Sequence, residues 1–168
     1  GLDEARWVPR EVTWFINAQK DEGLRPKHLK DDGDPTRRQM IKLYEAYEEA
    51  CKRNGVVDFA ELLLRSYELW RESPGLVEHY RTRFGHVLVD EFQDTNTIQY
   101  NWMKALVGAS GIPFVVGDDD QSIYRWRGAR VENLQQFRRD FPGVQVFKLE
   151  QNYRSTGNIL AAANAIIA

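Results

Sequence analysis

The sequence predicts an α/β protein in which a helical first half precedes a partial parallel sheet with flanking helices. Apolar residues at helical spacing, with helix start and stop signals between them, fill residues 1–84, and no strand pattern appears there. From His86 onward, short apolar runs alternate with helical patterns, which favours a parallel sheet. We therefore expect two domains, a helical one over residues 1–84 and an α/β one over residues 85–168.

Composition sets the limits for any function. The chain has 168 residues, of which 42% are hydrophobic, so it can form a real core. The formal net charge of −2 means that nucleic-acid binding would have to use a local patch. Cys51 is the single cysteine, which excludes an internal disulfide. No apolar run has membrane-spanning length and no leader pattern opens the chain, so we expect a cytoplasmic protein without a membrane partner.

Four helices are predicted in the first half. Each has a proline or an N-cap acid at its start and a glycine or a Ser-Pro-Gly break at its end. They run from Pro9 to Gly23, from the Asp34 cap to Gly55, from the Asp58 cap to Ser73, and from Pro74 to Phe84.

The second half predicts three strands and three helices in alternation. The strands are expected at 86–90, 113–117 and 144–149, and the helices near 96–107, near 130–140 and from Thr156 onward. Residues that follow the strands of a parallel sheet converge at one edge, where such sheets bind ligands. The chemistry should therefore lie at that edge.

The first strand ends in adjacent acids, Asp90 and Glu91. The apolar run before them is typical of a strand buried on both faces, so the acids must emerge at its C-terminal end. One such carboxylate can hold Mg²⁺, and a neighbouring glutamate can activate water. On this stretch alone, an equally good interpretation is that Asp90 or Thr95 caps the next helix.

The other two predicted strand ends strengthen the first interpretation. Gln93 follows the first strand, residues 117–129 follow the second, and residues 150–155 follow the third. Together they would supply further carboxylates, amides that could sense a phosphate, and a tyrosine–arginine pair suited to a nucleotide. The coincidence of these groups at one edge favours nucleotide binding.

The middle loop also interleaves aromatic and cationic side chains: Tyr124, Arg125, Trp126, Arg127 and Arg130. This combination can stack bases while it holds a phosphate backbone. The alternative is that Trp126 packs into the core and that the arginines pair with Glu132 and Asp140.

Three segments resemble motifs of the UvrD/Rep/PcrA group of superfamily 1 DNA helicases: LVDEFQDT, VGDDDQSIYRWRGA and LEQNYRST. The segment VDFAELLL resembles a further part of that group. The resemblance covers the whole chain. It implies that residues 1–84 are an incomplete helical inserted subdomain and that residues 85–168 are the second part of the first RecA-like ATPase subdomain.

The resemblance assigns roles by position. Asp90 and Glu91 would hold Mg²⁺, and the catalytic residues would be Glu91, Gln121 and Arg154. Contacts with ATP would come from Gln93, Gln121, Tyr153 and Arg154. Contacts with DNA would come from Phe59, Tyr124, Trp126 and Arg127.

The implied function is an ATP-dependent DNA helicase that translocates on single-stranded DNA and unwinds duplexes in repair or replication. Its partners would be single strands, duplex junctions and repair proteins. Two features depart from the family pattern: Arg125 stands where a glycine is expected, and the sequence contains no Gly-x-x-x-x-Gly-Lys-Ser/Thr phosphate loop. We therefore expect a fragment of a longer helicase that is inactive when isolated.

Two rivals remain open from the sequence. One is a two-metal nuclease that uses Asp90, Glu91 and the acids 118–120. The other is a non-catalytic module that binds DNA or a repair partner through its helical half.

Overall fold

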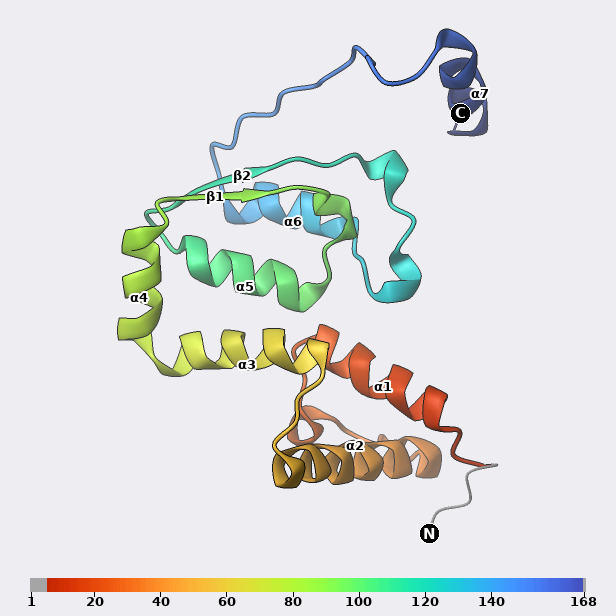
Figure 1. Ribbon diagram of the computed structural model, residues 1–168, viewed down its shortest axis with the longest axis vertical. Coiled ribbons are helices and arrows are strands. Elements are labelled where there is room, and N and C mark those ends of the chain that lie inside the picture. The colour runs from red at the N-terminus through yellow and green to blue at the C-terminus, as the bar shows by residue number, and fades with distance from the viewer. Residues whose placement is uncertain (1–5, 168) are drawn as a thin grey trace.

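The computed structural model describes residues 6–167 as a mostly helical protein with a small parallel sheet (Figure 1). Within these residues there are seven α-helices and two strands. None of the described helices combines the length and the apolar character that crossing a membrane requires.

The four helices predicted in the first half are confirmed. They are α1 (Pro9–Asp21), α2 (Pro35–Asn54), α3 (Phe59–Glu72) and α4 (Pro74–Arg83). The carboxylates of Asp34 and Asp58 accept hydrogen bonds from backbone N–H groups in the first turns of α2 and α3, as N-caps do. Gly55 ends α2 in the left-handed conformation, at a φ of 63°, which a residue without Cβ adopts at little cost.

The second half begins with a parallel β-α-β unit made of β1 (His86–Val89), α5 (Thr97–Val107) and β2 (Ile112–Val115). The strands pair in register from His86 opposite Ile112 to Val89 opposite Val115. The helices α6 (Glu132–Asp140) and α7 (Gly157–Ile167) follow. The predicted alternation of strands and helices is therefore confirmed for the first two strands.

The core lies around α5, which packs between the sheet and the helices of the first half (Figure 1). On the sheet side, Phe92, Tyr100 and Phe137 belong to one buried apolar cluster. On the other side, Trp102 of α5 stacks on Trp70 of α3, with ring centroids 4.4 Å apart. Burial of these aromatic rings makes α5 the element that joins the two halves.

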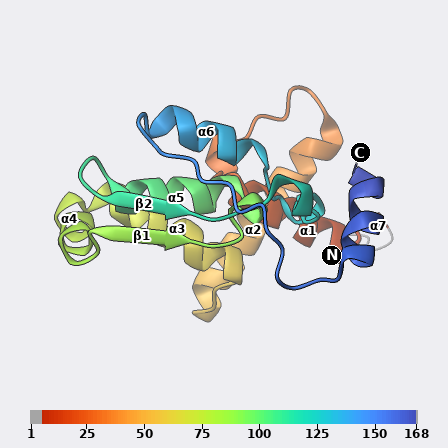
Figure 2. The ribbon, with the colours of Figure 1, turned by 90° about the horizontal axis from the view of Figure 1, so that it is seen from above.

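Two expectations about the sheet are wrong. The strands are not buried on both faces, because Leu88 is 73% exposed, and Ile112 and Phe114 on β2 are also exposed. Residues 144–149 form no strand: Phe147 and Leu149 are exposed, and the segment runs away from the sheet toward α7 (Figures 1 and 2). An apolar run becomes a strand only where a neighbour completes its hydrogen-bond ladder, and within residues 6–167 this run has none.

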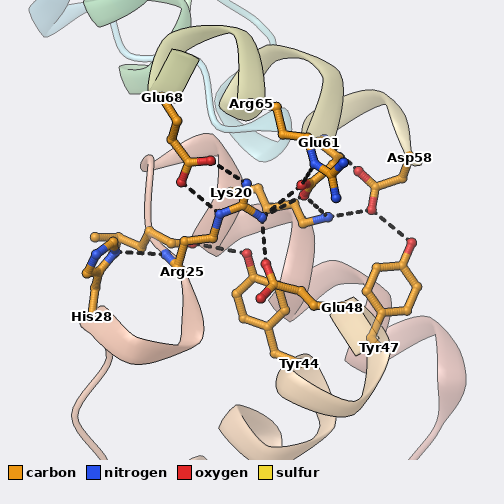
Figure 3. A network of polar contacts seen from close by, with 11 residues as sticks. Lys20, Arg25, His28, Tyr44, Tyr47, Glu48, Asp58, Glu61, Arg65 and Glu68 are labelled. Carbon is orange, nitrogen blue, oxygen red and sulfur yellow. Dashed lines mark hydrogen bonds and ion pairs between the residues drawn. The ribbon is translucent and has the colours of Figure 1, made fainter. Parts of the chain in front are cut away.

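A buried ion cluster joins α1 to α3 (Figure 3). The ammonium group of Lys20, whose side chain is 2% exposed, lies 2.7 Å from Asp58 Oδ2 and 2.8 Å from Glu61 Oε2. The hydroxyl of Tyr47 also donates to Asp58, at 2.8 Å. Asp58 is thus held from two sides while it caps α3.

Arg25 extends the same cluster (Figure 3). Its guanidinium contacts Glu48 at 2.6 Å, Glu61 at 2.8 Å and Glu68 at 2.6 Å, and so connects the α1–α2 linker to both α2 and α3. Buried charges are tolerated only when they are paired in this way.

The cluster keeps Glu61 ionised. Burial raises the pKa of Glu61, but hydrogen bonds from Lys20, Arg65 and Arg25 outweigh it and hold that pKa below the ordinary value of 4.5. A carboxylate with a lowered pKa stabilises the fold at pH values above its ordinary pKa and loses that contribution as the pH falls through the lowered one.

Replacing Glu61 by alanine is expected to cost about 3–5 kcal/mol of unfolding free energy, because Lys20 and Arg25 would stay buried with too few acids. Urea unfolding monitored by circular dichroism measures this. Glu45→Ala is the matched control, since Glu45 is an exposed glutamate of α2 that makes no ion pair within the described chain. Equal losses in the two variants would contradict a stabilising role for the cluster.

Candidate nucleotide and nucleic-acid site

The carboxylate pair lies where the sequence predicts it, at the C-terminal end of β1. Asp90 directly follows Val89 and is exposed, and its Oδ1 accepts a hydrogen bond of 2.9 Å from the Glu91 backbone N–H. Glu91 adopts the left-handed conformation, with a φ of 49°. A side chain in this conformation costs about 1–3 kcal/mol, and such residues cluster at functional sites.

Gln93 bridges the ends of the two strands. Its side chain, in a residue only 1% exposed, donates from Nε2 to Glu91 Oε2 at 2.7 Å and accepts at Oε1 from the Asp118 backbone N–H at 3.1 Å. Asp118 Oδ2 in turn accepts from Gln121 Nε2 at 2.7 Å. These hydrogen bonds connect the end of β1 to the loop that follows β2. We call the four residues that make them (Glu91, Gln93, Asp118 and Gln121) the amide relay.

Gly117 makes this bridge sterically feasible. A Cβ atom at this position would lie 2.7 Å from Gln93 Oε1 and 3.3 Å from the backbone nitrogens of Phe92 and Gln93. A side chain at this position would require the Gln93 amide to move from its bridging position and the adjacent backbone to shift, so glycine favours the close approach of the two loops.

The aromatic loop, residues 124–130, extends from the far end of the relay. Trp126 is 80% exposed, so the interpretation of Trp126 as a core residue is wrong. The Arg127 guanidinium lies 5.4 Å from the Tyr124 ring centroid and 5.8 Å from that of Trp126, within cation–π range. The loop thus presents one exposed indole with a cation beside it.

The alternative partners proposed for the arginines are also wrong. Arg130 pairs with Glu22 at 2.7 Å, and Asp140 pairs with Lys104 at 2.8 Å. Within residues 6–167, the salt bridges of Asp140 include no arginine of this loop, and Glu132 makes none.

Phe59 lies apart from that loop, as the first residue of α3. Its ring is 92% exposed, and the residue before it is the buried-cluster acid Asp58. Phe59 is therefore an apolar side chain displayed on a firmly anchored backbone.

Tyr153 and Arg154 are not brought to the relay. Both are exposed in the segment between the sheet and α7, and the hydrogen bond recorded for Arg154 is from its backbone N–H to Asn152 Oδ1, at 2.9 Å. Their assigned roles stay predictions.

The carboxylate pair suits a magnesium ion that arrives with a nucleotide. Mg²⁺ takes one or two protein carboxylates and keeps water and phosphate oxygens as its other ligands, and Asp90 and Glu91 supply that number. No group of three or more potential ligands gathers within the described residues, so the two-metal nuclease has no support there. At the same edge, Asp94 Oδ1 is buried and has no hydrogen-bond partner in the described structure. A hydrogen-bond donor placed beside it would offset the cost of burying this unpaired oxygen.

Several residues of this region were not found from the sequence. The sequence pattern suggests Asp118 only as a metal ligand, yet in the structure it links the two glutamines. Asp21 and Glu22 belong to none of the sequence motifs, although they contact residues 75 to 108 positions away. No local pattern in the sequence signals contacts over such separations.

The chain thus combines a parallel β-α-β unit, with acids at the end of its first strand, and an exposed loop of aromatic and cationic side chains after its second strand. This arrangement places it among the α/β proteins, whose ligand sites lie at the C-terminal ends of parallel strands. Comparison with known proteins makes this specific. The chain belongs to the UvrD/REP helicase N-terminal domain family, whose family model matches residues 1–142, so the family inferred from the motifs is confirmed.

Relatives with high identity carry helicase names. The chain is 61% identical over 166 residues to DNA helicase II of Salmonella typhimurium and equally to that of Escherichia coli, covering 99% of this chain and 23% of each relative. It is 42% identical over 179 residues to ATP-dependent DNA helicase UvrD1 of Mycobacterium bovis, covering 100% of this chain and 23% of that protein. The chain thus spans less than a quarter of the length of these relatives.

Replacing Gly117 by alanine is expected to cost about 1–3 kcal/mol, because the new methyl group collides with Gln93 and forces the bridge apart. Urea unfolding measures the cost, and faster hydrogen exchange at the Asp118 amide reports the broken bridge. Gly85→Ala is the control, since a Cβ there meets nothing within 4 Å. If Gly117→Ala behaved like Gly85→Ala, the close packing would not matter.

Proposed function

We propose that this chain is part of an ATP-dependent DNA helicase that couples ATP hydrolysis to movement along single-stranded DNA and to duplex unwinding. The observation that carries the proposal is the amide relay. It connects a carboxylate pair suited to nucleotide hydrolysis with the start of a loop suited to base stacking. The helicase names of the relatives support the same function.

On the nucleotide side, Asp90 is the residue proposed to hold Mg²⁺, together with Glu91. The ion would neutralise charge on the phosphates. Glu91 is proposed to take the proton from the attacking water, since its carboxylate emerges at the strand end and is oriented by Gln93. Gln93 and Gln121 would contact the γ-phosphate through amides that the relay already fixes.

On the DNA side, Trp126 and Tyr124 are proposed to stack on bases while Arg127 contacts the phosphate backbone. Phe59 would add a second apolar contact from α3. Because Gln121 lies three residues before Tyr124, a change at the phosphate end can reach the loop through a few backbone bonds.

The remaining parts of an ATPase are proposed to come from a longer protein. The relatives are more than four times as long as the part that matches, and the phosphate-loop pattern is missing from this sequence. Residues 1–84 would be an inserted helical subdomain and residues 85–168 part of a RecA-like ATPase subdomain. Tyr153 and Arg154 would complete the nucleotide site. We also propose action in the cytoplasm, at duplex junctions and with repair proteins.

A second candidate is a non-catalytic DNA-binding role for this chain alone. It is favoured by the same missing phosphate loop, because the exposed rings of Phe59 and Trp126 need no nucleotide to contact a single strand.

In the full-length protein, Glu91→Gln is expected to keep ATP binding and lower turnover by roughly 10²-fold or more, because the amide keeps the size of the side chain but cannot accept the proton. Nucleotide binding by fluorescence and phosphate release by a coupled assay measure the two effects. Glu45→Gln, the same change on an exposed face of α2, should leave both intact. Wild-type turnover in Glu91→Gln would remove Glu91 from the mechanism.

Trp126→Ala is expected to weaken single-strand binding by about 1–3 kcal/mol with little dependence on base sequence, since every base offers a π-face. Fluorescence anisotropy with oligo-dT and oligo-dA measures this, alongside the melting temperature. Trp14→Ala is the control, because Trp14 is another exposed tryptophan beside an arginine, at 4.8 Å. Normal DNA binding by Trp126→Ala would end the stacking hypothesis.

A further inference from the structure

The end of α1 contacts three separate segments through three consecutive side chains. Lys20, Asp21 and Glu22, which we call the clamp turn, face α3, the start of α5 and the aromatic loop, respectively. Segments that lie far apart in the sequence therefore share one rigid support.

Glu22 holds the aromatic loop. Its Oε1 accepts from Arg130 Nη2 at 2.7 Å and from Nε at 3.1 Å, and its Oε2 accepts from the Thr97 hydroxyl at 2.9 Å. The backbone N–H of Arg130 also donates to the carbonyl of Thr95, at 2.9 Å. The C-terminal end of the loop is thus fixed both to α1 and to the segment that follows the carboxylates.

Asp21 fixes the start of α5. Its Oδ1 accepts a hydrogen bond from Asn96 Nδ2 at 2.9 Å, and Asn96 caps α5 by accepting from the Gln99 backbone N–H at 2.9 Å. Gly128, in the left-handed conformation at a φ of 85°, lies against Asp21, so the loop passes close to this carboxylate.

Lys20 completes the turn on the opposite side. Its buried ammonium holds Asp58, the N-cap of α3, and the next residue is the exposed Phe59. The clamp turn therefore sets the position of Phe59 relative to the loop that carries Tyr124, Trp126 and Arg127.

We propose that Glu22 is a positioning residue for DNA binding, which holds the aromatic loop in one frame with Phe59 so that a single strand can contact both. This inference rests on the proposed function. Glu22 itself need not touch DNA, because its carboxylate is occupied by Arg130 and Thr97.

The sign of the effect separates positioning from simple electrostatics. If Glu22 only contributes a negative charge near the DNA and positions nothing, removing that charge strengthens DNA binding, because the charge no longer repels the phosphates. Positioning requires the opposite, since a loop that is no longer held must be ordered at the moment of binding.

The experiment compares Glu22→Gln with Glu45→Gln in the full-length protein, with labelled oligo-dT as the probe. The structure predicts that Glu22→Gln binds about fivefold more weakly, the scale of one exposed ion pair, with an unchanged melting temperature and unchanged ATP turnover without DNA. Glu45→Gln should match the unchanged protein. If Glu22→Gln binds oligo-dT as tightly as the unchanged protein, or more tightly, the positioning role is overturned.

A double-mutant cycle with Arg130→Gln tests the route. If Glu22 acts through Arg130, then Glu22→Gln has almost no further effect in the Arg130→Gln background. Fully additive effects overturn the proposal. Trp126→Ala in the same assay distinguishes failure of the clamp from failure of the proposed function. If Trp126→Ala weakens DNA binding and Glu22→Gln does not, the positioning role of Glu22 is rejected and the proposed function stands. If Trp126→Ala binds DNA normally, both the proposed function and the positioning role are rejected.

Discussion

The parallel pairing of β1 with β2 is the constraint on which the site depends. It brings the ends of two strands, more than 20 residues apart in the chain, to the same edge, and the Gln93 amide then spans the gap between the loops that follow them. The bridging side chain itself is buried, while Glu91 and Asp118 at its two ends are exposed. Burial strengthens the hydrogen bonds of the Gln93 amide by limiting its contact with water. Gly117 permits the approach. Carboxylates and aromatic loop are consequently parts of one connected structure.

The helical half supports that edge as well as packing beside it. The stacked rings of Trp70 and Trp102 fix α3 to α5, and the clamp turn adds polar contacts at the other end of the same interface. The buried charges of Lys20 and Glu61 are costly unless every partner is in place. Such a cluster tolerates little displacement, so it fixes the N-terminus of α3, where the exposed Phe59 begins the helix, relative to α1.

One face of the small sheet is apolar and exposed within residues 6–167. Leu88, Ile112 and Phe114 face outward, and residues 144–149 leave the sheet without pairing. Tyr153 and Arg154 are likewise exposed, and the segment before them pairs with neither β1 nor β2.

The sequence by itself determined the local features: the four helices with their caps at Asp34 and Asp58, two of the three strands, the acids at the end of β1, and the family. These follow from periodicity, capping and short motifs, whose physics acts within a few residues. Tertiary structure alone decided which strand runs find a partner, that Trp126 is exposed, that Gln93 bridges to Asp118, and that Glu22 holds Arg130. Those outcomes depend on contacts between residues 25 to 108 positions apart, for which no local pattern in the chain provides a signal.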